Sequence, residues 1–134
     1  MAAPTKTIHQ SEFFPSTPAI RIYEALLDGR KHSKMTGAKA TGDPHVGGKF
    51  TAWDGYISGA NLELEPGVKI VQSWQTTEWP EGAEPSHLEW HFIEKDGGTE
   101  VKMIHSKVPA SQAESYRQGW IDYYWTPMKE YFAA

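Results

Sequence analysis

The chain has 134 residues, of which 39% are apolar, and a formal net charge of −4 at pH 7. This length fits one domain, in which roughly two-thirds of the unfolded surface can be buried. The acidic balance argues against nucleic-acid binding, for which a basic surface is expected, and the absence of cysteine excludes disulfides, thiolate metal sites and a Cys nucleophile. We therefore expect a single domain over residues 1–134.

The start of the chain, MAAPTKTIHQ, lacks the apolar segment of a secretory signal, and no later apolar run is long enough to span a bilayer. The sequence therefore predicts a cytoplasmic protein with no membrane partner.

The first third of the chain predicts one strand and two short helices. The strand covers Lys6 to Phe14. Thr17-Pro18 places a capping hydroxyl before a proline at the first helical position, and apolar residues then recur at helical spacing up to Asp28-Gly29. A second helix from Arg30 to Thr36 ends at Gly37.

The middle of the chain predicts an antiparallel run of strands. Three turn signals separate them, namely Asp54-Gly55, Glu65-Pro66-Gly67 and Asp96-Gly97-Gly98. The predicted strands are a short piece near Ala38 to Thr41, then Lys49 to Trp53, Tyr56 to Leu64, Lys69 to Thr77, Leu88 to Glu94 and Thr99 to Val108.

The last segment predicts a long helix with an aromatic face. Ser111 and Glu114 have the spacing of a capping box, and Tyr116, Trp120 and later aromatic residues follow at intervals of three and four. Pro127 should kink or distort this helix, because it lacks a donor and clashes one turn back.

These elements predict an α+β domain in which a curved antiparallel sheet wraps around the C-terminal helix. That helix is the only predicted element long and apolar enough to cover one face of the sheet. Strand alternation turns one set of residues toward it. This set is Ile70, Gln72, Trp74, Leu88, Trp90, Phe92, Val101, Met103 and His105.

Several motifs in order resemble a known family. They are Gly47-Gly48-Lys49-Phe50, Trp53-Asp54-Gly55-Tyr56-Ile57-Ser58-Gly59, Leu62-Glu63-Leu64, Ile70-Val71-Gln72-Ser73-Trp74, Trp79-Pro80, Val108-Pro109, Gly119-Trp120 and Tyr124-Trp125. The pattern is similar to the C-terminal domain of the activators of the ninety-kilodalton heat-shock protein ATPase. That domain belongs to the START-like, or SRPBCC, superfamily of helix-grip proteins, and the similarity runs from about Phe13 to Phe132.

The resemblance implies a non-enzymatic co-chaperone module of the stress response that interacts with the heat-shock chaperone and modulates its ATPase. In the two-domain activators an N-terminal domain anchors to the chaperone and the C-terminal domain contacts its ATP-binding domains; this sequence contains the second part. Single-domain relatives imply an alternative, a carrier or sensor of a small hydrophobic ligand.

Each of these two functions points to its own residues. For chaperone docking, the residues are Arg30, Lys31, Lys34 and Lys39, because residues 30–49 carry five basic residues against one acid. For a ligand, the expected lining of a cavity between sheet and helix is Trp53, Ile70, Gln72, Trp74, Trp90, Met103, His105, Trp120 and Tyr124. The alternative is that the same aromatic rings close-pack and leave no space.

Catalytic and cofactor signals are weak. His87, Glu89 and His91 alternate on one strand and resemble a metal-ligand set, but they face away from the expected cavity, and we expect no metal and no cofactor. His105 could act as an acid or base toward a ligand, although an inward histidine is more often hydrogen-bonded in the core. Gly47-Gly48 fits no phosphate-binding motif, because a strand follows it.

Overall fold

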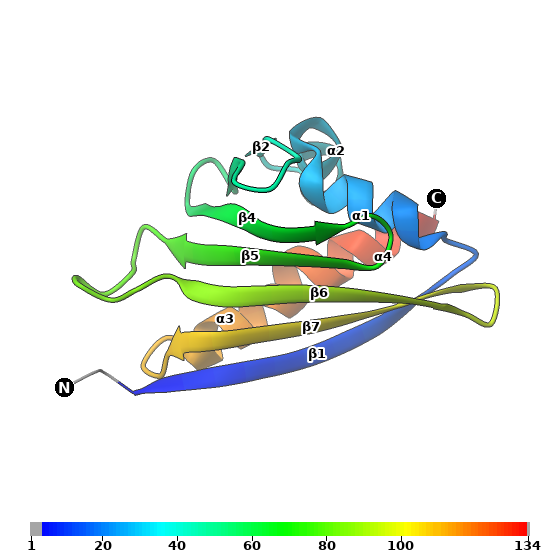
Figure 1. Ribbon diagram of the computed structural model, residues 1–134. Coiled ribbons are helices and arrows are strands. Elements are labelled where there is room, and N and C mark those ends of the chain that lie inside the picture. The colour runs from blue at the N-terminus through cyan, green and yellow to red at the C-terminus, as the bar shows by residue number, and fades with distance from the viewer. Residues whose placement is uncertain (1–3, 134) are drawn as a thin grey trace.

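The computed structural model describes residues 4–133, which form one seven-stranded antiparallel sheet with helices on one side (Figure 1). The strand order is β1-β7-β6-β5-β4-β3-β2. The strands are β1 (Thr5–Pro15), β2 (Thr41–Gly42), β3 (Lys49–Ala52), β4 (Ile57–Glu65), β5 (Lys69–Thr76), β6 (Ser86–Lys95) and β7 (Gly98–Pro109).

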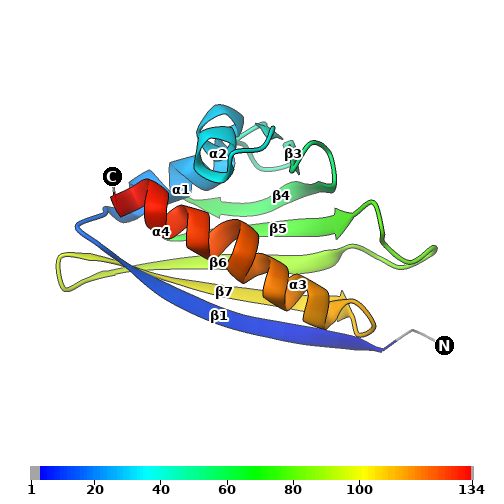
Figure 2. The same ribbon diagram turned by 180° about the vertical axis from the view of Figure 1, so that it is seen from behind.

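Two short helices follow β1, and one long helix ends the chain. The short ones are α1 (Ala19–Leu27) and α2 (Gly29–Thr36). The long helix runs without a break through α3 (Ala113–Trp120), the π-helical segment η1 (Ile121–Trp125) and α4 (Thr126–Ala133). Figure 2 shows it lying across one face of the sheet, so the predicted helix-grip architecture is confirmed. No helix of the described chain is long and apolar enough to cross a membrane.

The core lies between this helix and the inner face of the sheet. All nine residues predicted to face inward on β5, β6 and β7 are buried. Side chains alternate between the two faces of a strand. The pairing of β5 with β6 and of β6 with β7 therefore aligns the inward positions of all three strands on the same face. Trp90, at 2% exposure, sits beneath Trp120 and Trp125 of the helix with ring centroids 5.5 and 5.7 Å away.

The three predicted turns form as their residues require. Asp54 and Gly55 both have positive φ, and the Tyr56 N–H donates to the Trp53 carbonyl across them at 3.1 Å. Trp53 itself has φ 53°, so β3 ends earlier than predicted, at Ala52. Asp96-Gly97 forms a two-residue turn, and strand pairing therefore continues to Lys95 and Gly98.

Both predicted helix caps are wrong. The Thr17 hydroxyl donates to the Pro15 carbonyl, Pro18 is the N-cap residue of α1, and the Ala19 N–H donates instead to Glu94 Oε2 of β6 at 3.1 Å. At the start of the C-terminal helix, the predicted capping box of Ser111 and Glu114 does not form. There α3 begins at Ala113, with Gln112 as its N-cap residue and no side-chain cap. In the first case a carboxylate distant in sequence supplies the acceptor, and local spacing cannot reveal such a partner.

The predicted distortion at Pro127 is confirmed and takes the form of a π-helical turn. The Thr126 N–H bonds to the Ile121 carbonyl five residues earlier, so the wider turn accommodates a proline that cannot donate. Adjacent residues Tyr124 and Trp125 are both only 4% exposed and both lie near Trp90. The π turn thus widens the apolar face where the helix crosses the centre of the sheet.

Candidate functional site

A groove of about 800 Å³ lies beside the C-terminal helix. It lies between that helix, the turn connecting β3 to β4, and the end of β5. Its lining is mainly aromatic, with a few polar side chains. The lining residues are Trp53, Tyr56, Ile57, Trp74, Glu78, Ser111, Gln112, Ser115, Tyr116, Gly119, Trp120, Tyr123 and Tyr124.

Local backbone features create this groove. Trp53 leaves the line of β3 through its positive φ, and its ring meets the exposed Tyr123 ring edge to face at 5.2 Å. Gly119 contributes no side chain on the neighbouring turn of the helix, where an added Cβ would meet only Tyr123 Cδ2, at 3.8 Å. Trp74 and Tyr116, with ring centroids 5.2 Å apart, add aromatic walls.

Hydrogen bonds between the sheet and the helix fix the end of the groove near α3. Thr76 Oγ1 donates to the Tyr116 hydroxyl at 2.7 Å, and that hydroxyl donates to Gln112 Oε1 at 2.6 Å. The Gln112 amide then donates to the Glu78 carbonyl at 2.7 Å. Each polar group in this chain of contacts has a partner, so the groove has a defined shape.

The space directly between sheet and helix is nearly filled. The hollow there measures about 20 Å³, roughly the room one water molecule needs. Gln72, Trp74, Trp90, Trp120 and Tyr124 of the predicted lining border it. Ile70, Met103 and His105 border neither hollow, and Trp53 borders only the groove. The inward aromatic residues therefore mostly pack against one another, and the usable space lies to one side of them.

His105 is completely buried and both of its ring nitrogens are occupied. Trp120 Nε1–H donates to His105 Nδ1 at 3.1 Å, so a neutral ring carries its proton on Nε2 and donates it to Ser86 Oγ at 2.7 Å. Ser86 in turn donates to the Trp74 carbonyl at 2.8 Å. Burial, with a smaller effect of His87, lowers the pKa of His105 to about 3. This geometry does not support acid or base catalysis by His105.

His32 is a second buried histidine, and no sequence motif marked it as a candidate site residue. Its Nδ1–H donates to the Leu26 carbonyl at 3.1 Å, and its Nε2 accepts from the Tyr124 hydroxyl at 2.8 Å. Burial lowers the pKa of His32 and raises that of Tyr124. The ring thus joins α2 to the C-terminal helix through polar contacts. Only its position on the inner face of a short polar helix could have indicated this role.

Gln72 is engaged in supporting a loop. Its amide Nε2 donates to Asn61 Oδ1 at 2.9 Å, and Asn61 Nδ2 donates to the carbonyls of Asp43 and His45. The Gln72 amide therefore bonds within the protein and supports Asn61, which holds the connection between β2 and β3 in place.

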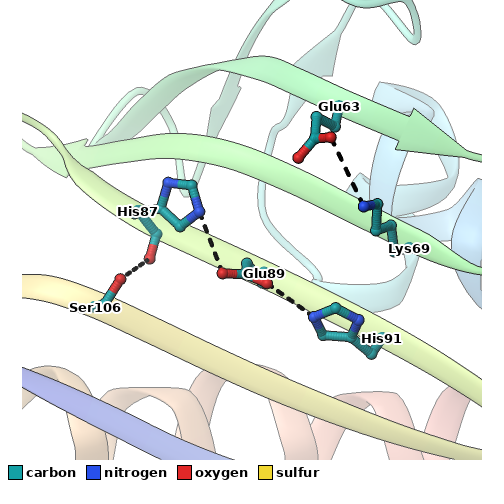
Figure 3. Close-up of polar contacts among 6 residues, drawn as sticks. All are labelled: Glu63, Lys69, His87, Glu89, His91 and Ser106. Carbon is teal, nitrogen blue, oxygen red and sulfur yellow. Dashed lines mark hydrogen bonds and ion pairs between the residues drawn. The ribbon is translucent and has the colours of Figure 1, made fainter.

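His87, Glu89 and His91 lie together on the opposite face of the sheet, as predicted (Figure 3). The carboxylate of Glu89 lies between the rings, 3.2 Å from His87 Nε2 and 2.9 Å from His91 Nε2. Within residues 4–133 no group of three or more His, Asp or Glu side chains is placed to hold a metal ion. The three residues form a polar cluster on the face that carries no helix.

The predicted docking residues are exposed on and just after α2. Arg30, Lys31 and Lys34 lie on that helix, and Lys39 follows it. Lys31 also approaches Glu24 at 3.5 Å, with both side chains half exposed, so its charge is partly offset. The basic surface is separate from the aromatic groove, whose lining contains none of these four side chains.

The fold, the lateral aromatic groove and the basic surface of α2 together define a helix-grip protein with a packed core. Residues 16–133 match the family model described as Activator of Hsp90 ATPase homolog 1-like protein, and the chain belongs to this family.

Curated relatives agree with this assignment. The human activator of 90 kDa heat shock protein ATPase homolog 1 is 36% identical over 129 residues, which cover 96% of this chain and 38% of the relative. A homologue from Dictyostelium discoideum is 30% identical over 116 residues, covering 87% of this chain and 30% of the relative. The chain thus spans less than half the length of these relatives.

Solved structures also agree. An HSP90 activator from Plasmodium falciparum has a TM-score of 0.83 and 25% identity, with 96% of each chain covered. The Aha1 dimer from Colwellia psychrerythraea has a TM-score of 0.74 at 16% identity, with 88% of this chain and 90% of that chain covered, and its likeness supports the fold.

Proposed function

We propose that this domain binds the 90 kDa heat shock protein and modulates its ATPase. The observation that carries the proposal is the 36% identity to the human activator over 96% of this chain. The filled space between sheet and helix is consistent with a protein that acts through its surface, because little of the interior is left for cargo. The exposed basic residues of α2 provide a surface that would attract an acidic partner.

The test is the ATP turnover of purified human 90 kDa heat shock protein with increasing amounts of this domain. We expect a saturable change in turnover, with binding measured in parallel by calorimetry at low salt. An inhibitor that blocks the ATP site of the chaperone must abolish the turnover, which controls for contaminating ATPases. Absence of both a binding heat and a change in turnover would contradict the proposal.

A second candidate function is a carrier or sensor of a small hydrophobic ligand. The observation that favours it is the groove of about 800 Å³, which lies within the size range of small-molecule sites and has a mainly aromatic lining. The ligand would bind beside the C-terminal helix, with Trp53, Trp74 and Trp120 among its contacts. Native mass spectrometry of the purified domain tests this, and an empty protein that also binds no apolar probe would argue against it.

A further inference from the structure

The lining of the groove carries charge of only one sign. Among its side chains the carboxylate of Glu78 is the only charged group, and no lysine, arginine or histidine is present. The connection over residues 77–85, which supplies Glu78, also holds the exposed Glu81 and Glu84 and has no basic residue. The groove and its surroundings on this side are therefore electronegative.

Contacts on both sides hold Glu78 in place. The Tyr56 hydroxyl donates to Glu78 Oε2 at 2.7 Å, while the backbone of Glu78 accepts from the Gln112 amide and donates to Thr76 Oγ1 at 3.2 Å. Burial, together with the bond to Glu78, raises the pKa of Tyr56 to about 12, so this hydroxyl remains a donor at neutral pH.

Among the described residues, Glu78 has no cationic partner. Within residues 4–133 the structure shows no ion pair at this side chain. Lys39 reaches the turn between β3 and β4 only through its carbonyl, which accepts from the Asp54 N–H at 3.0 Å, and its side chain does not line the groove. The carboxylate of the exposed Glu78 thus lies at the mainly aromatic groove without a counter-ion among the described residues.

The aromatic rings favour the same sign of ligand charge. The faces of tryptophan and tyrosine rings are electron-rich and attract cations within about 6 Å. Trp53, Tyr116 and Tyr123 border the groove. A cationic group would therefore gain from these rings as well as from Glu78, whereas a carboxylate or phosphate would be repelled.

We propose that the groove binds a small molecule with an apolar body and a single ammonium group, the ammonium lying beside Glu78 and the apolar body against Trp74 and Tyr116. This inference rests on the second candidate function and specifies its ligand class. It is independent of chaperone binding, since the groove does not include the basic residues of α2.

Three probes with the same pyrenebutyl body separate charge from apolar contact: the trimethylammonium, the alcohol and the carboxylate. Binding is measured by energy transfer from the protein tryptophans to pyrene. We expect the ammonium probe to bind about tenfold more tightly than the carboxylate at low salt, with the alcohol between them. The difference should shrink as salt shortens the screening length below about 8 Å.

Matched variants locate the effect. Glu78→Gln keeps an acceptor for Tyr56 and should reduce the ammonium preference to about twofold. Glu81→Gln removes the same charge from the same connection but lies outside the groove lining, and should leave the preference unchanged. Gly119→Leu should weaken all three probes by filling the groove, and the open space around Gly119 allows this variant to fold.

The outcomes separate this inference from the function on which it rests. Equal binding of the three probes would overturn the ammonium assignment but support an apolar ligand. No binding of any probe would remove both. Tightest binding of the carboxylate, or an equal effect of Glu81→Gln and Glu78→Gln, would overturn the role given to Glu78.

Discussion

At the scale of single residues, two buried histidines make the stability of this fold depend on pH. His105 is held neutral because burial lowers its pKa to about 3, and burial lowers the pKa of His32 as well. In the unfolded chain a histidine titrates near 6.5. Below that pH the unfolded state therefore takes up protons that the folded state does not, and the contribution of these histidines to stability falls as the pH decreases from about 6.5 toward 3.

This predicts a measurable effect of replacing His105. Lowering the pH from 7.5 to 5.0 should reduce the free energy of unfolding by about 2 kcal/mol through His105 alone, because the folded state keeps this histidine unprotonated. His105→Gln should be less stable at neutral pH, since it disturbs the contacts to Ser86 and Trp120, but it should lose less stability over this pH interval. Urea unfolding at the two pH values measures both effects.

The control is His9→Gln, because His9 is exposed on β1. This variant should keep the pH dependence of the unaltered protein. An identical loss of stability in the His105 variant and the unaltered protein would show that His105 is not held neutral in the core.

At the scale of elements, side-chain hydrogen bonds fasten the C-terminal helix to the edge strand β1, and Gln10 makes two of them. Gln10 Oε1 accepts from the Trp125 indole N–H at 2.8 Å, and its Nε2 donates to the Arg117 carbonyl at 3.1 Å. Lys129 adds a bond to the Phe13 carbonyl at 3.0 Å. These contacts give an edge strand hydrogen-bond partners in the helix, in addition to its pairing with β7.

Gln10→Ala should therefore destabilise the protein by about 1 to 3 kcal/mol, because it leaves the mostly buried Trp125 indole without an acceptor. Ser11→Ala is the matched control, since Ser11 is the exposed neighbour on the same strand. Urea unfolding gives the free-energy change, and amide exchange over residues 113–133 should show faster opening of the helix only in the Gln10 variant. Equal stability of the two variants would contradict this role.

Over the whole molecule, charge is distributed unevenly. Residues 30–49 carry five basic residues and one acid, whereas residues 78–100 carry seven acids and one lysine. The basic residues lie on and after α2, and some of the acidic residues lie on the connection beside the groove. The two proposed functions thus involve two surfaces of opposite sign, and they can be tested separately.

Charge reversal on the basic surface should weaken binding to the heat-shock chaperone. Arg30→Glu combined with Lys39→Glu is expected to reduce affinity at low salt by about tenfold, because each exposed charge contributes up to about 1 kcal/mol and its reversal adds repulsion. Lys6→Glu with Lys102→Glu changes the net charge equally on β1 and β7 and should have little effect. Calorimetry at two salt concentrations measures both pairs, and equal losses would exclude a specific role for α2.

The elements and their inward faces were predictable from the sequence because they depend on local rules. Strand alternation identified Trp90, Met103 and His105 as buried, and turn chemistry located the hairpin at Asp96-Gly97. The motifs from Gly47 to Trp125 were enough to indicate the family, and the match over residues 16–133 bears this out.

The tertiary structure decided how much space remained and which polar groups met. Whether the aromatic residues enclose a cavity depends on their packing at sub-ångström precision, and here they fill the centre and leave the groove at the side. Glu94 caps α1, Tyr124 bonds to His32 and Tyr56 holds Glu78 across long sequence separations. Sequence spacing determines what a residue can do within its own element, whereas partners from other elements are fixed only once the chain has folded.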